Sequence, residues 1–265
     1  MIWLLRNWDM SGQLAAPGRR SVRLLIWLDV LVLLAWGLAL LRFWLMGRLP
    51  LFIHPNYIPL VVAAGLLLLV LSGIQGLRTL ALVRLQAREM RHTTLLPPQV
   101  GSGLLLSVAL IALVMTPRPF TSDTALQRGV SDTLSLTRPQ PQAFRISVEP
   151  SQRTLLDWIR TLNVYPEPDA YTGQAVKVQG FVVYEPNQPN NYLTISRFVI
   201  TCCAADAYPV GLPVKLAGDR SQYPKDSWFE VTGNMVTESL NQQRQLVIQA
   251  SAFTPIPEPA NPYMY

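Results

Sequence analysis

Hydrophobic residues follow two different patterns in this chain, one on each side of residue 117. The N-terminal part carries long apolar runs, whereas the C-terminal part carries short runs with alternating apolar and polar positions. Long runs are typical of membrane-spanning helices, and short alternating runs are typical of half-buried strands. The pattern predicts a transmembrane region at residues 1–117, a linker with several prolines at 118–144 and a soluble domain at 145–265.

Three segments of the N-terminal part reach the roughly 20 residues that a helix needs to cross a bilayer. They are residues 24–46, 58–77 and 97–116, and the third reaches this length only with its uncharged lead-in of Pro, Gln and Gly. A secretory signal peptide is the alternative for the first segment. That segment, however, exceeds the roughly 7–15 residues of a signal sequence's apolar region and has no small-residue cleavage site after it. We expect three membrane-spanning helices.

Arginine is unevenly distributed around these spans. Four arginines precede the first span, one lies between the first and the second, and four precede the third. Because positive charge accumulates on the cytoplasmic side, this pattern predicts a cytoplasmic N-terminus. Three spans then place the C-terminal domain outside the cytoplasm, in a multi-pass protein of the cell (inner) membrane.

The net charge of +6 is confined to the membrane part. Residues 1–120 carry eleven arginines and three acidic residues, whereas residues 121–265 carry eleven basic and thirteen acidic residues. Basic residues beside apolar spans orient those spans in the bilayer, so the charge does not indicate a nucleic-acid surface. We expect contact with membrane lipid and none with nucleic acid.

The C-terminal domain begins with one predicted amphipathic helix. Ser151 can cap it, and the apolar residues Leu155, Trp158, Ile159 and Leu162 recur at helical spacing before Pro166 ends it. Five strand-like runs with turn residues between them follow, at 175–184, 192–202, 210–217, 228–236 and 245–253. Gly180 inside the first run suggests a bend or bulge.

Five short curled strands favour an OB-like barrel with one packed helix, within an α+β or mainly β domain. An open antiparallel sheet with one helix is the alternative.

Two adjacent cysteines, Cys202 and Cys203, are the only ones in the chain, and Asp206 follows three positions later. Neighbouring side chains of a continuing strand point to opposite faces, but a turn at residues 204–206 would bring both sulfurs and the carboxylate together. A disulfide between them would be strained, because consecutive Cα atoms lie about 3.8 Å apart and disulfides prefer roughly 4.4–6.8 Å.

Several roles remain open for this cysteine pair. A zinc site normally needs four ligands, and the only histidines, His54 and His92, belong to the N-terminal half. Two thiolates suit a soft metal ion or metalloid, or a site completed by a second copy of the chain in a homo-oligomer. Alternatively, both cysteines are small buried residues at a strand end. Thiol redox exchange is the third reading, although the pair lacks Cys-x-x-Cys spacing.

Asp29 is the other candidate, because a carboxylate within a span usually faces a bundle interior or a water path. It lies near the inner end of the first span, where it can instead pair with Arg23 or reach the headgroups. No P-loop, G-x-S-x-G elbow, H-E-x-x-H motif or dinucleotide glycine fingerprint occurs in the sequence, so we expect no conventional enzyme and no catalytic residue.

Longer motifs surround the cysteines. They are Gly180–Val182, Arg197–Asp206 with Val210-Gly211 after it, Trp228–Gly233 and Pro262–Tyr265. With these motifs the chain resembles the YcgQ-type family of bacterial membrane proteins, whose members are described as permease subunits. The resemblance implies an N-terminal transmembrane part, a soluble C-terminal domain and a larger polytopic permease-like partner. It marks Arg197 as part of the cysteine motif but implies neither a substrate nor a catalytic residue.

Two hypotheses follow. In the first, the chain is an accessory permease subunit that holds a soft metal or metalloid through Cys202, Cys203 and Asp206. In the second, it is an assembly module whose cysteines are core residues, with the Tyr263–Tyr265 tail and the barrel rim as its docking surface. An extracytoplasmic thiol oxidoreductase is a further alternative and requires an exposed thiol of low pKa.

Overall fold

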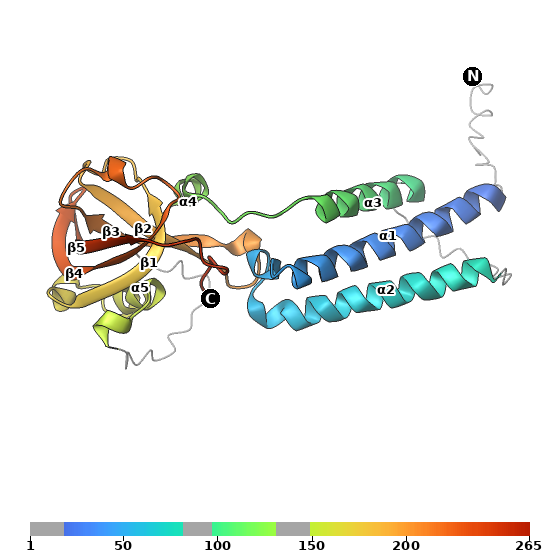
Figure 1. Ribbon diagram of the computed structural model, residues 1–265, viewed down its shortest axis with the longest axis horizontal. Helices are drawn as coiled ribbons and strands as arrows, with labels where there is room; N and C mark the ends of the chain where they lie inside the picture. Colours follow the sequence, from blue (N-terminus) through green and yellow to red (C-terminus); the bar gives the residue numbers. More distant parts are fainter. Residues whose placement is uncertain (1–18, 82–96, 131–148) are drawn as a thin grey trace, which may run out of the picture. The chain divides into compact units, whose positions relative to one another are not determined.

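The computed structural model describes residues 19–81, 97–130 and 149–265. The chain divides into two compact units, Met1–Met46 with Pro59–Thr116 and Gly47–Ile58 with Pro117–Tyr265. Figure 1 shows the helices of the first unit and the strands of the second. Four of the nine arginines that predict the topology, Arg6, Arg84, Arg88 and Arg91, lie outside the described residues, as do residues 131–144 of the predicted linker at 118–144.

Among the described residues, the first unit contains the helices α1 (Arg19–Leu45), α2 (Ile58–Leu80) and α3 (Pro98–Val114). Two stretches, Leu24–Leu45 and Pro55–Leu80, are long and apolar enough to cross a membrane. They confirm that the first two predicted segments are apolar helices of spanning length. Helix α3 has 17 residues. Its apolar stretch, Gln99–Val114, is shorter than the two stretches of spanning length. The count of three spans stays a prediction.

Small residues allow α1 and α2 to approach closely. A Cβ atom on Gly37 of α1 would lie 2.7 Å from Leu69 of α2 and 3.1 Å from the carbonyl oxygen of Gly65. The buried Ser72 of α2 donates a 3.0 Å hydrogen bond to the carbonyl oxygen of Val30. Gly65 and Ser72 are among the small residues of the second apolar segment, and they line this helix contact.

The second unit is built on five strands whose positions agree with the five predicted runs. The strands are β1 (Ala175–Val183), β2 (Tyr192–Val199), β3 (Tyr208–Lys215), β4 (Trp228–Leu240) and β5 (Gln243–Pro255). They close into a barrel in the order β1-β2-β3-β5-β4, and only β3 and β5 pair in parallel. The predicted five-stranded ring is therefore confirmed, and an open sheet is excluded.

Glycines in this barrel mark close approaches of neighbouring strands. A Cβ atom on Gly180 of β1 would lie 2.6 Å from the carbonyl oxygen of Ser196 in β2. Gly180 pairs in register with Phe229 of β4, whereas the register of the β4–β5 pair shifts between Thr232 and Gly233. The bulge that was expected at Gly180 therefore lies in β4. Gly180 is required because a side chain at this position would collide with the backbone of β2.

Helix α5 (Leu155–Val164) precedes the barrel, as predicted, but its cap differs from the prediction. Thr154, not Ser151, is the N-cap, because its hydroxyl accepts from the backbone N–H of Asp157 and the Asp157 carboxylate accepts from the N–H of Thr154. This reciprocal pair satisfies two N–H groups that a helix start leaves free. Ser151 lies in the preceding 3-10 turn, η3 (Pro150–Gln152).

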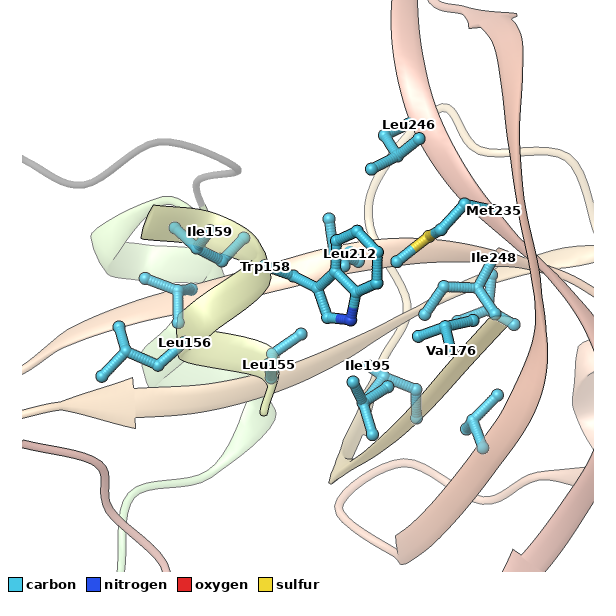
Figure 2. Packing of buried hydrophobic residues seen from close by; sticks show 14 of the residues in the cluster. Leu155, Leu156, Trp158, Ile159, Val176, Ile195, Leu212, Met235, Leu246 and Ile248 are labelled. Carbon is cyan, nitrogen blue, oxygen red and sulfur yellow. The ribbon is translucent and has the colours of Figure 1, made fainter. Parts of the chain in front are cut away.

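The apolar stripe of α5 closes the interior of the barrel. Its residues Leu155, Trp158, Ile159 and Leu162 are buried, as the helical spacing predicts. Figure 2 shows the indole of Trp158 reaching from α5 toward Leu212, while Met235 and Ile248 lie beyond it. This main core holds the helix on the sheet.

A second apolar core covers the opposite face of β1 and β2. Its buried members are Leu51, Ala125, Phe181, Val183, Phe198, Ile200, Ala207, Trp228 and Tyr263. They come from the barrel, from the short helix α4 (Ser122–Arg128), from the C-terminal tail and from the α1–α2 connection at residues 47–58. Four separate parts of the chain are thus packed together on this face.

Candidate functional site

The candidate site is the loop that joins β2 to β3. Strand β2 ends at Val199, so Cys202 lies beyond the strand that was predicted to include it. Residues 204–206 form the 3-10 turn η5, and β3 begins at Tyr208. The strand stops because the carboxylate of Asp206 turns back and accepts from the backbone N–H groups of Cys202 and Cys203, at 2.8 and 3.2 Å.

The turn brings the two thiols together. The Sγ atoms of Cys202 and Cys203 are 3.6 Å apart, and both cysteines are free. These two sulfurs and a carboxylate oxygen of Asp206 all lie within 4.8 Å of one another. The three side chains therefore form a compact group of potential ligands, as a turn at this place predicts.

Neither cysteine is a core residue. Cys202 is exposed and Cys203 is half-buried. The interpretation of the pair as small buried residues at a strand end is therefore wrong, because the turn directs the segment to the surface.

Hydrogen bonds set the protonation of this group. Partial burial alone would raise the pKa of Asp206, but donors from Thr201, Cys202 and Cys203 outweigh it and lower that pKa below its ordinary value. The hydrogen bonds of Cys202 to Asp206 and Cys203 raise the pKa of the Cys202 thiol to about 11. At neutral pH the site therefore holds a carboxylate beside a protonated Cys202.

We expect Asp206→Asn to change the acid stability of the second unit. Because the folded-state pKa of Asp206 is lowered, its carboxylate stabilises the fold above its unfolded-state pKa of about 3.9, and this contribution is lost as pH falls through the folded value. The free energy of unfolding of the variant should be about 1 kcal/mol lower at pH 7, as for the loss of a capping carboxylate. Below pH about 4 its free energy of unfolding should fall less steeply with pH than that of the native protein. Denaturant unfolding at several pH values measures both, and equal slopes for the two proteins would contradict the assignment.

The α1–α2 connection packs directly against this loop. Cys203 forms an antiparallel bridge with Ile53. The N–H of His54 donates to the carbonyl oxygen of Cys202 at 3.0 Å, and the N–H of Ala204 donates to that of Phe52 at 2.7 Å. The loop is thus held from within by Asp206 and from outside by residues 52–54.

His54, which sequence reasoning kept apart from the cysteines, contacts their loop through its backbone. Its imidazole Nδ1 accepts from the N–H of Asn56 at 3.2 Å, and its ring lies edge-on to Tyr265 at 4.9 Å. Within the part of the chain that the structure describes, the group of potential ligands contains the cysteines and Asp206 without this imidazole. His92 lies outside the described residues.

Arg197 holds the C-terminal tail. Its guanidinium donates to the carbonyl oxygens of Asn261, Pro262 and Tyr263 at 3.0 to 3.4 Å and lies 5.5 Å from the ring centre of Trp228. Burial lowers the pKa of this arginine. Arg197 therefore has a structural role in fixing the tail, which pairs with β2 through Met264 and Val199.

Asp29 lies in the first unit, away from the cysteine loop in the chain. Its carboxylate accepts a 2.7 Å hydrogen bond from the hydroxyl of Ser102 in α3. A contact to a neighbouring helix is one of the two roles that the sequence leaves open for this residue. The side chain of Arg23, its alternative partner, is outside the described part.

The tail and the α1–α2 connection are the parts of this site that sequence reasoning missed. Tyr265 donates to the carbonyl oxygen of Pro50, which lies 215 positions away in the chain. No pattern in the sequence predicts a contact between residues this far apart. The motif residues Pro262–Tyr265 were noticed only through the resemblance.

Comparison with known proteins identifies the second unit. Residues 142–265 match the family model described as DUF1980 C-terminal domain. UPF0703 protein YcgQ of Bacillus subtilis (strain 168) is 28% identical over 105 residues, which are 38% of this chain and 36% of that protein. The match thus spans little more than a third of the relative. Residues 142–265 are therefore similar to DUF1980 C-terminal domains, and the match to YcgQ supports a relationship of this part of the chain to the YcgQ-type family.

Proposed function

We propose that this chain is a membrane-anchored accessory subunit of a permease, whose extracytoplasmic OB-like domain binds a soft metal or metalloid through Cys202 and Cys203. The observation that carries the binding role is the group of two free thiols and one carboxylate within 4.8 Å on a surface loop. Sulfur ligands select soft ions. The permease partner rests on the family resemblance.

The hydrogen bonds of the α1–α2 connection support three spans. Residues 52–54 bond to residues 202–204, so the connection and the barrel share one side of the membrane. If α1 and α2 both span, the chain after α2 is on the other side and has to cross again before residue 117. Helix α3 is then the third span, at about 25 Å of length.

Contacts between α1 and α3 support the same path. Asp29 of α1 bonds to Ser102 of α3, and Trp36 of α1 donates to the carbonyl oxygen of Leu105 at 3.2 Å. The residue that is further along α1 contacts the residue that is further along α3, so the two helices run in the same direction. A helix that is parallel to α1 would cross the membrane in the same direction as α1, which is what the third of three spans has to do.

A cysteine-accessibility experiment tests this topology. In intact spheroplasts at mildly alkaline pH, we expect a membrane-impermeant maleimide to label the exposed Cys202 of the native chain slowly, because the raised pKa of this thiol leaves little thiolate. In the C202S/C203S background, a single cysteine introduced at Ser131 should also react, whereas one introduced at Gln86 should react only after the membrane is opened. Labelling at Gln86 with protection at Ser131 and Cys202 would reverse the orientation.

Metal titration of the full chain in detergent tests the binding role. We expect one soft ion per chain for the native protein and no measurable soft-ion binding for C202S/C203S, because this variant lacks both sulfur ligands. Ala205→Ser is the matched control, since Ala205 is exposed in the same loop. Equal binding by the native protein and the double variant would exclude the metal role.

The two other functions receive less support. Tyr263 is 4% exposed and Met264 is 9% exposed, so most of the tail packs on the chain's own barrel and is not a free docking surface. A thiol oxidoreductase needs an exposed thiol of low pKa, whereas the pKa of the exposed Cys202 is raised. Binding at the thiol pair is the function that the geometry favours.

A further inference from the structure

We infer that the ligand of the thiol pair is a trivalent, pyramidal metalloid hydroxide such as arsenous acid, As(OH)₃, captured by both sulfurs at once. This inference rests on the proposed binding function and names the ligand class. It follows from the distance between the sulfurs, from the number of ligands at hand and from the construction of the loop.

The separation of the sulfurs fixes the angle at the bound atom. With a bond of about 2.3 Å from the ion to each sulfur, as for zinc thiolates, two sulfurs 3.6 Å apart subtend roughly 100°. Linear coordination would require about 4.6 Å between them at the same bond length. The pair therefore fits a pyramidal or tetrahedral centre and does not fit a linear two-coordinate ion.

The number of available ligands favours a pyramidal centre over a tetrahedral one. A tetrahedral dication needs two ligands besides the thiolates. In the described part of the chain the group offers one, the carboxylate of Asp206, and that carboxylate already accepts from Thr201 and from two backbone N–H groups. A pyramidal trivalent centre needs only one further ligand, and a metalloid hydroxide brings its own oxygen.

The capture step is balanced without any other reactant. As(OH)₃ and the two thiols give a dithiolate complex, (Cys-S)₂As–OH, and two water molecules. Two As–O bonds and two S–H bonds break, while two As–S bonds and two O–H bonds form. Arsenic stays trivalent and both sulfurs keep their oxidation state, so no oxidant or reductant is required.

The loop is constructed to present two thiols in one direction. Asp206 holds the backbone N–H groups of Cys202 and Cys203, and the bonds to residues 52–54 hold the carbonyl oxygen of Cys202 and the N–H of Ala204. A fixed backbone lowers the ordering cost of binding through both sulfurs. A disulfide between adjacent cysteines is strained, which keeps both thiols available.

Competitive titrations of the full chain in detergent test this inference. The reductant should be a phosphine, because dithiol reductants bind arsenite themselves. We expect sodium arsenite to bind one per chain, and the arsenic X-ray absorption spectrum to show two As–S bonds and one As–O bond. Cys202→Ser and Cys203→Ser should each weaken binding about 100-fold or more, because closing the second As–S bond is intramolecular. Ala205→Ser should bind as the native chain does.

The other outcomes are distinguishable. Tighter binding of Zn²⁺ or Cu⁺ than of arsenite, lost in the cysteine variants, would overturn the metalloid inference and leave the proposed binding function standing. Arsenite binding that survives in both single variants would also overturn the inference. If none of the three probes binds to the folded native chain, the binding function itself fails.

Discussion

Trp158→Ala is expected to lower the free energy of unfolding of the barrel-containing unit by about 3–5 kcal/mol. Trp158 is fully buried in the main core and lies edge-on to Tyr171. Its indole Nε1 has no hydrogen-bond partner in the described part of the chain, so the loss comes from packing and from the cavity left behind. The guanidinium of Arg153, 4.8 Å from the ring centre, loses a cation–π contact as well.

Val164→Ala is the matched control for this change. Val164 ends the same helix and is 54% exposed, so we expect a loss of at most about 0.5 kcal/mol. Hydrogen exchange of the strand amides, followed by mass spectrometry, reports the opening free energy of this unit within the full chain. Similar losses for the two variants would show that α5 does not close the barrel core.

Gly233→Ala is expected to destabilise the same unit by about 2–3 kcal/mol or more, or to change the pairing of β4 with β5. The added Cβ atom would overlap the carbonyl oxygen of Gln249, at the place where the register shifts. Since the clash is with backbone, no side-chain rotation can relieve it.

Gly218→Ala serves as the control for Gly233→Ala. The nearest atom to a Cβ at Gly218 is the side-chain nitrogen of Gln222 at 3.8 Å, an ordinary contact. We expect its effect to stay within about 0.5 kcal/mol. If strand amides exchange equally in the two variants, the close approach at Gly233 does not constrain the sheet.

Elements with a short-range signal were predictable from the sequence. The alternation in residues 175–184 and the spacing of Leu155, Trp158 and Ile159 reflect burial on one face, and the structure has β1 and α5 there. The true cap of α5 also carried a signal, since Asp157 stands three positions after Thr154 and completes a capping box. Ser151 lacked such a partner.

Contacts between distant segments were not predictable. Strand β3 pairs in parallel with β5, and nothing in either sequence specifies that pairing over its alternatives. The extent of β2 was predicted too long, because the apolar residues up to Ile200 continue the pattern while the carboxylate of Asp206 ends the strand. The packing of residues 47–58 on the cysteine loop joins segments that are about 150 positions apart.

The bonds between residues 52–54 and 202–204 also tie the cysteine loop to the segment that joins two apolar helices, α1 and α2. A peptide group at Cys202 or Ala204 cannot rotate without breaking its bond to His54 or Phe52 or moving that residue with it. The same short segment continues into α1 at one end and into α2 at the other. A change in the backbone of the cysteine loop therefore displaces residues 52–54, the short segment between the end of α1 and the start of α2.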